Sequence, residues 1–159
     1  DRLLRLLSLS NNAFSSFVTG QVTEAFILGT LCCLGMLILR LPYALPVSVI
    51  IATLSLIPIF GAWIGAATGA FLIVFQSPIK ALTFLIFLLI LQQVEGNLIY
   101  PKVVGKSVGL PGLWVLAAVT LGGGAFGVLG MLLGVPVCSI VYSLVQEFIR
   151  GKPAEESAK

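Results

Sequence analysis

The polar residues best placed to do chemistry gather near one predicted helix end, in the sequence LQQVEGN over residues 91–97. Gln92 and Glu95 are three residues apart, and Gln93 and Asn97 are four apart. Side chains at these spacings are neighbours on a helix surface, so the run predicts two adjacent polar ridges. A carboxyl group flanked by amides can bind a proton, a cation or a polar solute.

The role of this polar end depends on its surroundings. Inside a bilayer the Glu95 carboxylate would be costly unless it were paired or faced a water-filled cavity, and such an acid marks a functional site by default. Lys102 or Lys106 could then be its partner. At a membrane surface the same residues would simply end the helix. Glu24, near the start of another apolar stretch, allows the same two interpretations.

The sequence lacks the residues that catalytic, phosphate-binding and metal sites need. The sequence contains no His, and no phosphate-binding loop, nucleophile triad or paired catalytic carboxylates can be assembled from it. Cys32, Cys33 and Cys138 lie in apolar segments and are odd in number, which favours buried thiols over a metal site. We therefore expect no enzyme activity, no cofactor and no metal. The formal charge of +3 without a basic stripe gives no sign of nucleic-acid binding.

The composition places the chain in a membrane. Of its 159 residues, 58% are hydrophobic and only 9% are charged, against roughly 25% charged in ordinary soluble domains. Residues 41–79 and 107–146 contain no Asp, Glu, Lys or Arg. Each run would be about 60 Å long as a helix, roughly twice the hydrocarbon thickness of a bilayer. Each run is therefore expected to be two passes or a hairpin.

Breaks in these runs predict the elements. Residues 2–17 resemble an amphipathic helix lying in the membrane interface, because leucines alternate there with Arg and Ser. Prolines and glycines then divide the chain into further helices at about 21–39, 42–57, 63–76, 81–99 and 126–148. Residues 113–121 are too short to cross a bilayer and meet the glycines at 122–124, which predicts a re-entrant or broken helix. Pro136 is expected to kink the last span.

Glycines four residues apart mark two segments. One contains Gly61, Gly65 and Gly69, and the other contains Gly123, Gly127, Gly130 and Gly134. Such spacing lets membrane helices approach closely, which is the simpler interpretation. Both segments also follow an apolar arm across a short break, so the chain could hold two related hairpins. Paired interrupted helices of this kind point to the central site of a transporter.

The ends of the chain carry weaker signals. Arg150 and Lys152 follow the last span directly, which favours a cytoplasmic C-terminus. We expect residues 1–150 to form a transmembrane domain and 151–159 a polar cytoplasmic tail. Because the chain begins with Asp1 and shows no signal peptide, it could be part of a longer protein.

Three segments together resemble one family. LSLIPIFGAWIG, LQQVEGNLIYPKVVGKSVGLPGLWVLAAV and GGGAFGVLGMLLGVPV follow in the order found in the C-terminal half of PerM-like permeases of the autoinducer-2 exporter family. The resemblance covers about residues 14–148. The family motif falls on Pro58, Gly61, Gly65, Gln92, Glu95, Asn97, Pro101, Gly105, Gly127 and Pro136.

This resemblance implies a multi-pass protein of the bacterial inner membrane that exports a small molecule such as the autoinducer-2 signal of quorum sensing. Some relatives resemble sodium(lithium)/proton antiporters, and the chain would be the C-terminal part of a longer permease. The N-terminal helices of the family are absent from this sequence.

Our leading hypothesis is a secondary transporter driven by an ion gradient. The alternatives are an antiporter and a non-transporting membrane scaffold, and the expected partners are lipid, a small-molecule or cation substrate and a second copy of the chain. The candidate pathway residues are Gln92, Gln93, Glu95, Asn97 and Glu24. The candidates for helix packing or gating are Pro58, Gly61, Gly65, Gly69, Pro101, Gly123, Gly127, Gly130, Gly134 and Pro136.

Overall fold

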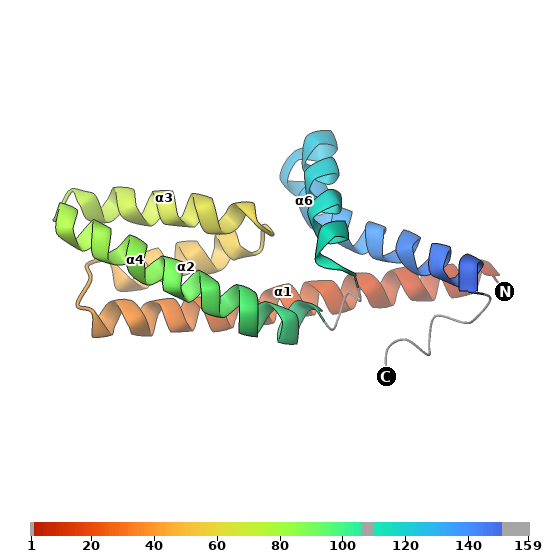
Figure 1. The fold of residues 1–159 in the computed structure, drawn as a ribbon, viewed down its shortest axis with the longest axis horizontal. Helices are drawn as coiled ribbons and strands as arrows, with labels where there is room; N and C mark the ends of the chain where they lie inside the picture. The colour runs from red at the N-terminus through yellow and green to blue at the C-terminus, as the bar shows by residue number, and fades with distance from the viewer. Residues whose placement is uncertain (1, 106–109, 151–159) are drawn as a thin grey trace. The chain divides into compact units, whose positions relative to one another are not determined.

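The computed structural model describes residues 2–105 and 110–150, and every regular element in this part of the chain is a helix. In chain order the elements are α1 (Arg2–Ile38), α2 (Ala44–Ser55), α3 (Phe60–Val74), α4 (Pro78–Val94), the π-helical turns η1 (Glu95–Ile99) and η2 (Pro101–Gly105), and α6 (Gly112–Arg150) (Figure 1). The predicted polar tail lies outside the described residues, as does Lys106.

Judged by length and composition, three helical stretches of the described residues could cross a membrane: Leu7–Ile38, Pro78–Val104 and Gly112–Ile149, the last of which is interrupted at Gly127. Large apolar side chains also cover much of the outside. Phe26 and Ile38 are 74% and 80% exposed. An apolar exterior of this extent suits lipid as the surrounding medium. The prediction of an all-α, multi-pass membrane bundle is confirmed.

The first helix corrects one prediction. Sequence predicts an interfacial helix over 2–17 and a separate span from Gln21, whereas α1 runs unbroken from Arg2 to Ile38. The chain between these two segments contains a single glycine, Gly20, and no proline. One glycine inside a helix costs only about 1 kcal/mol relative to Ala, which is too little to end it. The location of residues 2–17 in the membrane interface remains a prediction.

The chain forms two compact units, and their boundary falls inside α1. Residues 21–103 form one unit, called here the four-helix unit, from the second part of α1 with α2, α3 and α4. The described parts of 1–20 and 104–159 form the other, called the hairpin unit because α6 dominates it.

Within the four-helix unit, the chain reverses direction three times, at residues 39–43, 56–59 and 75–77. Prolines mark all three reversals. Pro42 and Pro58 lie next to Tyr43 and Ile59, which have positive φ angles of 56° and 69°. Pro78 begins α4, where a missing N–H is harmless, and the Lys80 N–H donates to the Ser77 hydroxyl at 3.4 Å. The four helical segments therefore run antiparallel in sequence order (Figure 1).

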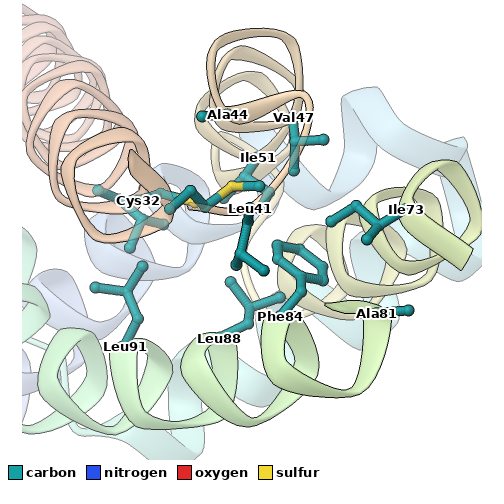
Figure 2. Packing of buried hydrophobic residues seen from close by; sticks show 12 residues of the cluster. Cys32, Leu41, Ala44, Val47, Ile51, Ile73, Ala81, Phe84, Leu88 and Leu91 are labelled. Atoms are coloured by element: carbon teal, nitrogen blue, oxygen red, sulfur yellow. The ribbon is translucent and has the colours of Figure 1, made fainter. Parts of the chain in front are cut away.

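The core of this unit is built from residues spaced three or four apart on each helix, a spacing that makes one apolar stripe per helix. Figure 2 shows Cys32 of α1 and Ile51 of α2 facing Phe84, Leu88 and Leu91 of α4. The whole buried cluster comprises Leu28, Cys32, Met36, Leu41, Ala44, Val47, Ile51, Ile73, Ala81, Phe84, Leu88 and Leu91. This core fixes the register of all four helices.

α2 and α3 form a close hairpin through glycines. A Cβ atom on Gly61 would overlap the backbone carbonyl of Leu54, and one on Gly65 would lie 3.2 Å from Ile51 Cγ1. Gly69 is equally buried, and a Cβ there would lie 2.5 Å from the Phe84 ring. Only glycine allows helices to approach this closely.

α6 is a second hairpin, turned at Gly127, whose φ of 64° and ψ of −141° are the only non-helical angles within this element. A Cβ on Gly130 would overlap the backbone of Gly122, and one on Gly134 would lie 2.5 Å from the Ala118 carbonyl oxygen. These pairings show two antiparallel arms, 112–126 and 128–150, that touch through small residues.

The turn of this hairpin corrects one further expectation. Sequence predicts a break at residues 122–124, but these glycines stay helical and the break lies at Gly127. Gly122 is needed for the close approach of the arms, and Gly127 supplies the backbone angles that other residues rarely adopt. Helical angles continue through Pro136, and the kink expected there stays a prediction.

Candidate functional site

The site begins with two polar residues that α1 buries. Gln21 and Glu24 are three residues apart, so they lie on one face of the helix, and they are only 3% and 2% exposed. Among the described residues, neither the amide oxygen nor the amide nitrogen of Gln21 has a hydrogen-bond partner, and Oε2 of Glu24 also lacks one. Buried polar groups are nearly always paired, so three unpaired atoms here need an explanation. Glu24 is therefore enclosed by protein, and its depth in a membrane stays a prediction.

Other helices bring further polar groups to Glu24. Its carboxyl group has the hydroxyl of Ser55 as a hydrogen-bonding neighbour and interacts electrostatically with Glu95. Tyr100 interacts electrostatically with both carboxyl groups. The antiparallel order explains this convergence. Residue 21 opens the four-helix unit on α1, Ser55 ends α2, and Glu95 follows the end of α4. All three positions therefore lie at the same end, called here the acidic end.

The backbone at Glu95 is unusual. Here α4 gives way to the π-helical turns η1 and η2, and the Tyr100 N–H donates to the Glu95 carbonyl, five residues back. Pro101 explains the change, because it has no N–H and its ring clashes with the carbonyl four residues earlier. A π-helical turn rotates the side chains that follow it and is frequent at functional sites.

The opposite end of the four-helix unit is basic. Arg40 and Lys80 lie at exposed positions beside two of the turns, where Gln76 Nε2 donates to the Tyr43 hydroxyl at 3.1 Å. Along α1, Glu24 lies about 24 Å from Arg40, given about 1.5 Å of rise per residue. The hydrocarbon layer is about 30 Å thick. If the basic end lies at a membrane surface, the acidic end lies within the hydrocarbon depth, short of the far side.

The α2–α3 hairpin has a matching length. Its arms of 12 and 15 residues would be about 18 and 22 Å long, too short to cross about 30 Å of hydrocarbon. The hairpin begins and ends at the basic end and turns back beside the acidic end. Pro58 is buried in this turn, and Ile59 and Phe60 are exposed. Irregular backbone at such depth survives only where protein or water satisfies it.

The candidate residues at the end of α4 separate into two groups. Gln92 and Glu95 are half-buried, and Glu95 interacts electrostatically with Glu24. Gln93 and Asn97 are exposed and bind each other, with Asn97 Nδ2 donating to Gln93 Oε1 at 3.4 Å. Lys102, suggested as a partner for Glu95, is exposed.

The other predicted residues lie in the turns and hairpins. Pro101 begins η2 and is exposed, and Gly105 ends it. In the hairpin unit, a Cβ on Gly123 would lie 2.7 Å from Met131 Cε. In the described residues, no three His, Cys, Asp or Glu side chains gather as a metal site would require. Cys32, Cys33 and Cys138 are free thiols, and Cys32 is part of the core.

Sequence reasoning missed Gln21, although a signal was present. Gln21 and Glu24 repeat the Gln-x-x-Glu spacing of Gln92 and Glu95. A repeated polar pair in two apolar helices could have indicated that the two pairs meet. The sequences around Gln21 and Gln92 do not show which helices pack together to bury Gln21.

Comparisons with known proteins agree with this architecture. A family model described as AI-2E family transporter matches residues 1–150. "Putative transport protein YueF" of Bacillus subtilis (strain 168) is 34% identical over 148 residues, which cover 92% of this chain and 40% of that protein. "Putative transport protein YrrI" of the same organism is 32% identical over 141 residues, covering 88% of this chain and 40% of its own length.

A more distant relative is "Putative permease PerM" of Escherichia coli (strain K12), 26% identical over 148 residues, or 92% of this chain and 42% of that protein. The chain thus spans about two fifths of the length of these relatives. No solved structure matches the chain. With a buried polar site inside a helical membrane bundle and a family match over residues 1–150, the chain belongs to the AI-2E transporter family.

Proposed function

We propose that this chain is the ion-coupled part of a secondary transporter that exports a small polar solute, such as an autoinducer-2-like signal, across the bacterial inner membrane. The observation that carries the proposal is the Glu24 carboxyl group, which is buried among membrane helices, has an unpaired oxygen and interacts with a second carboxyl group, Glu95. Membrane transport itself is the role that the family supports. Substrate class and direction follow the family resemblance, and the cytoplasmic C-terminus follows from Arg150 and Lys152.

The proposed mechanism uses the charge of this pair. Two carboxylates held near each other in a medium of low dielectric repel strongly, so binding of one proton or one cation stabilises the pair. Loading and unloading of that ion changes the net charge of the acidic end. The state of the site can thereby favour one arrangement of the surrounding helices over another, which is the requirement for coupling an ion gradient to transport.

The two hairpins are the candidate moving parts. Gly61 and Gly65 form a smooth contact along α2, and Gly122, Gly130 and Gly134 do the same between the arms of α6. Contacts through glycines lack interlocking side chains, so one helix can slide along another at low cost. The turn at Pro58 lies at the acidic end, where such a movement would open or close access to Glu24.

A flux assay tests the proposal. The full-length protein is reconstituted in vesicles, and efflux of a candidate solute is measured under an imposed proton or sodium gradient. Glu24→Gln keeps the shape of the side chain but cannot exchange an ion, so coupled efflux should be lost. Glu147→Gln, a carboxyl change in the hairpin unit, is the matched control. Full gradient-driven efflux by Glu24→Gln would refute the proposal.

A second candidate is a sodium(lithium)/proton antiporter that moves no organic solute. The observation in its favour is that the site consists of two carboxyl groups and oxygen-bearing neutral groups, which suit small cations. It predicts proton movement in vesicles when sodium or lithium is added without any other solute. A scaffold role is less well supported, because the Gly61, Gly65 and Gly69 ridge is already occupied by α2.

A further inference from the structure

Gln21 is not used by the mechanism above, yet it is the least satisfied polar side chain at the site. It is 3% exposed, and both its Oε1 and its Nε2 lack partners in the part of the chain that the structure describes. An apolar residue at this position would avoid the penalty of burying an unpaired amide. A group that binds at Gln21 would remove the penalty, and Gln21 shares a helix face with Glu24, which carries an unpaired oxygen of its own.

We propose that Gln21 determines which ion the Glu24 site accepts, by supplying its amide oxygen as a ligand to a dehydrated monovalent cation such as sodium. The proposal rests on the proposed ion-coupled function and deepens it. A proton needs only the carboxyl group of Glu24. Sodium instead needs several oxygen atoms to replace its hydration shell. Gln21 would therefore matter for sodium and not for protons.

The structure supplies a set of oxygen ligands from two helices. Oε1 of Gln21 and Oε2 of Glu24 are the unpaired oxygens of α1. Ser55, at the end of α2, donates its hydroxyl proton to the Ala52 carbonyl at 2.8 Å. The same hydroxyl is a hydrogen-bonding neighbour of the Glu24 carboxyl group, so its oxygen lies beside the site. Hard cations prefer carboxylate, amide and hydroxyl oxygens of this kind.

The charges around the site favour a cation over a neutral solute. Glu95 and Ser55 are the groups that act on the Glu24 carboxyl in the described part of the chain, with no Lys or Arg among them. The remaining titratable neighbour is Tyr100, which interacts with both carboxyl groups. A neutral solute would leave the carboxylate charge uncompensated. A water molecule that accompanies the cation can accept the hydrogen bond that Nε2 of Gln21 offers.

The test measures sodium binding separately from transport. Melting of the full-length purified protein is followed while sodium chloride replaces choline chloride at constant ionic strength, because a ligand that binds only the folded state raises the melting temperature. Gln21→Leu removes both polar atoms at similar size. Gln76→Leu, an exposed glutamine at the basic end, is the matched control. Stabilisation by sodium should disappear in Gln21→Leu and persist in Gln76→Leu.

Vesicle assays complete the test. In Gln21→Leu, half-maximal sodium-driven transport should need at least about tenfold more sodium, since even outer partners change metal affinity by that factor. Proton-driven transport should stay as in the wild type. Equal sodium dependence in both proteins overturns the proposal, and so does equal loss of the sodium and proton responses, which would show a merely structural role.

Two further outcomes distinguish failure of the cation site at Gln21 from failure of the ion-coupled function. If Gln21→Leu fails to fold, Gln21→Asn keeps the amide oxygen but shortens its reach, so it should weaken the response to sodium more than the response to protons; an unchanged ratio of the two counts against the proposal. If Glu24→Gln transports normally while sodium stabilises the wild type and not Gln21→Leu, the ion-coupled function fails and the cation site stands.

Discussion

The carboxyl group of Glu24 in α1 interacts electrostatically with that of Glu95, the first residue of η1, although 70 residues of sequence separate them. The first of these groups is 2% exposed and lies on the same helix face as the unpaired amide of Gln21. A negative charge on Glu95 therefore disfavours a second negative charge on Glu24.

Neutralising Glu95 should change the pH profile of transport without abolishing transport. In Glu95→Gln the Glu24 carboxyl group loses its acidic neighbour, so the pH at which the transport rate changes should shift. Transport rates of vesicles measured across the pH range check this. An unchanged profile would show that Glu95 does not act on Glu24 during the transport cycle.

Replacing Pro101 should reshape the acidic end. Pro101→Ala restores an N–H and removes the ring, so the π-helical turns can convert to ordinary α-helix. This would rotate the side chains that follow, and transport should fall strongly while the melting temperature stays equal or rises. Cysteine accessibility at Tyr100→Cys, in the wild-type and Pro101→Ala backgrounds, reports the rotation. Full transport by Pro101→Ala would contradict a functional role for η1 and η2.

The α6 hairpin should tolerate alanine at one glycine and not at another. A Cβ on Gly130 would overlap the backbone of Gly122, whereas one on Gly124 meets nothing within 4 Å. Gly130→Ala should destabilise the protein by about 1–3 kcal/mol, as overpacking does. Gly124→Ala should be neutral or stabilising by up to about 1 kcal/mol. Unfolding in mixed micelles measures both, and equal effects would disprove the close approach of the arms.

Gly127 should resist substitution for a different reason. A Cβ there has open space, but its φ of 64° and ψ of −141° are angles that side chains rarely adopt. Gly127→Ala should therefore cost about 1–3 kcal/mol through backbone strain alone. The same unfolding measurement applies. A stabilised Gly127→Ala would mean that the arms are joined by a continuous helix.

Much of the fold could be predicted because hydrophobicity and proline act locally. The uncharged runs and their breaks give the two short-armed hairpins, and Pro42, Pro58 and Pro78 mark the turns where the structure has them. Two errors have the same origin. A single Gly20 did not end α1, and three consecutive glycines did not end an arm of α6, because packing decides whether a permissive residue bends or stays helical.

The site was only partly predictable. Glu24 and Glu95 stand out in the sequence as acids in apolar helices, and their interaction needs only the antiparallel order of the helices. The burial of Gln21 and Glu24 could not be predicted, since it depends on which face of α1 a neighbouring helix covers. Gln93 and Asn97 lie beside Glu95 in sequence but point outward and bind each other. Gln21, buried and unpaired, carried no local signal except the Gln-x-x-Glu spacing that it shares with Gln92.

The central claim is that Glu24 exchanges the coupling ion, and ion-coupled current tests it most directly. Currents from membranes containing the full-length protein are recorded after a step in proton or sodium concentration, for the wild type and for Glu24→Gln matched in amount and melting behaviour. We predict a transient current in the wild type that Glu24→Gln lacks. A current of equal size in Glu24→Gln would contradict the account.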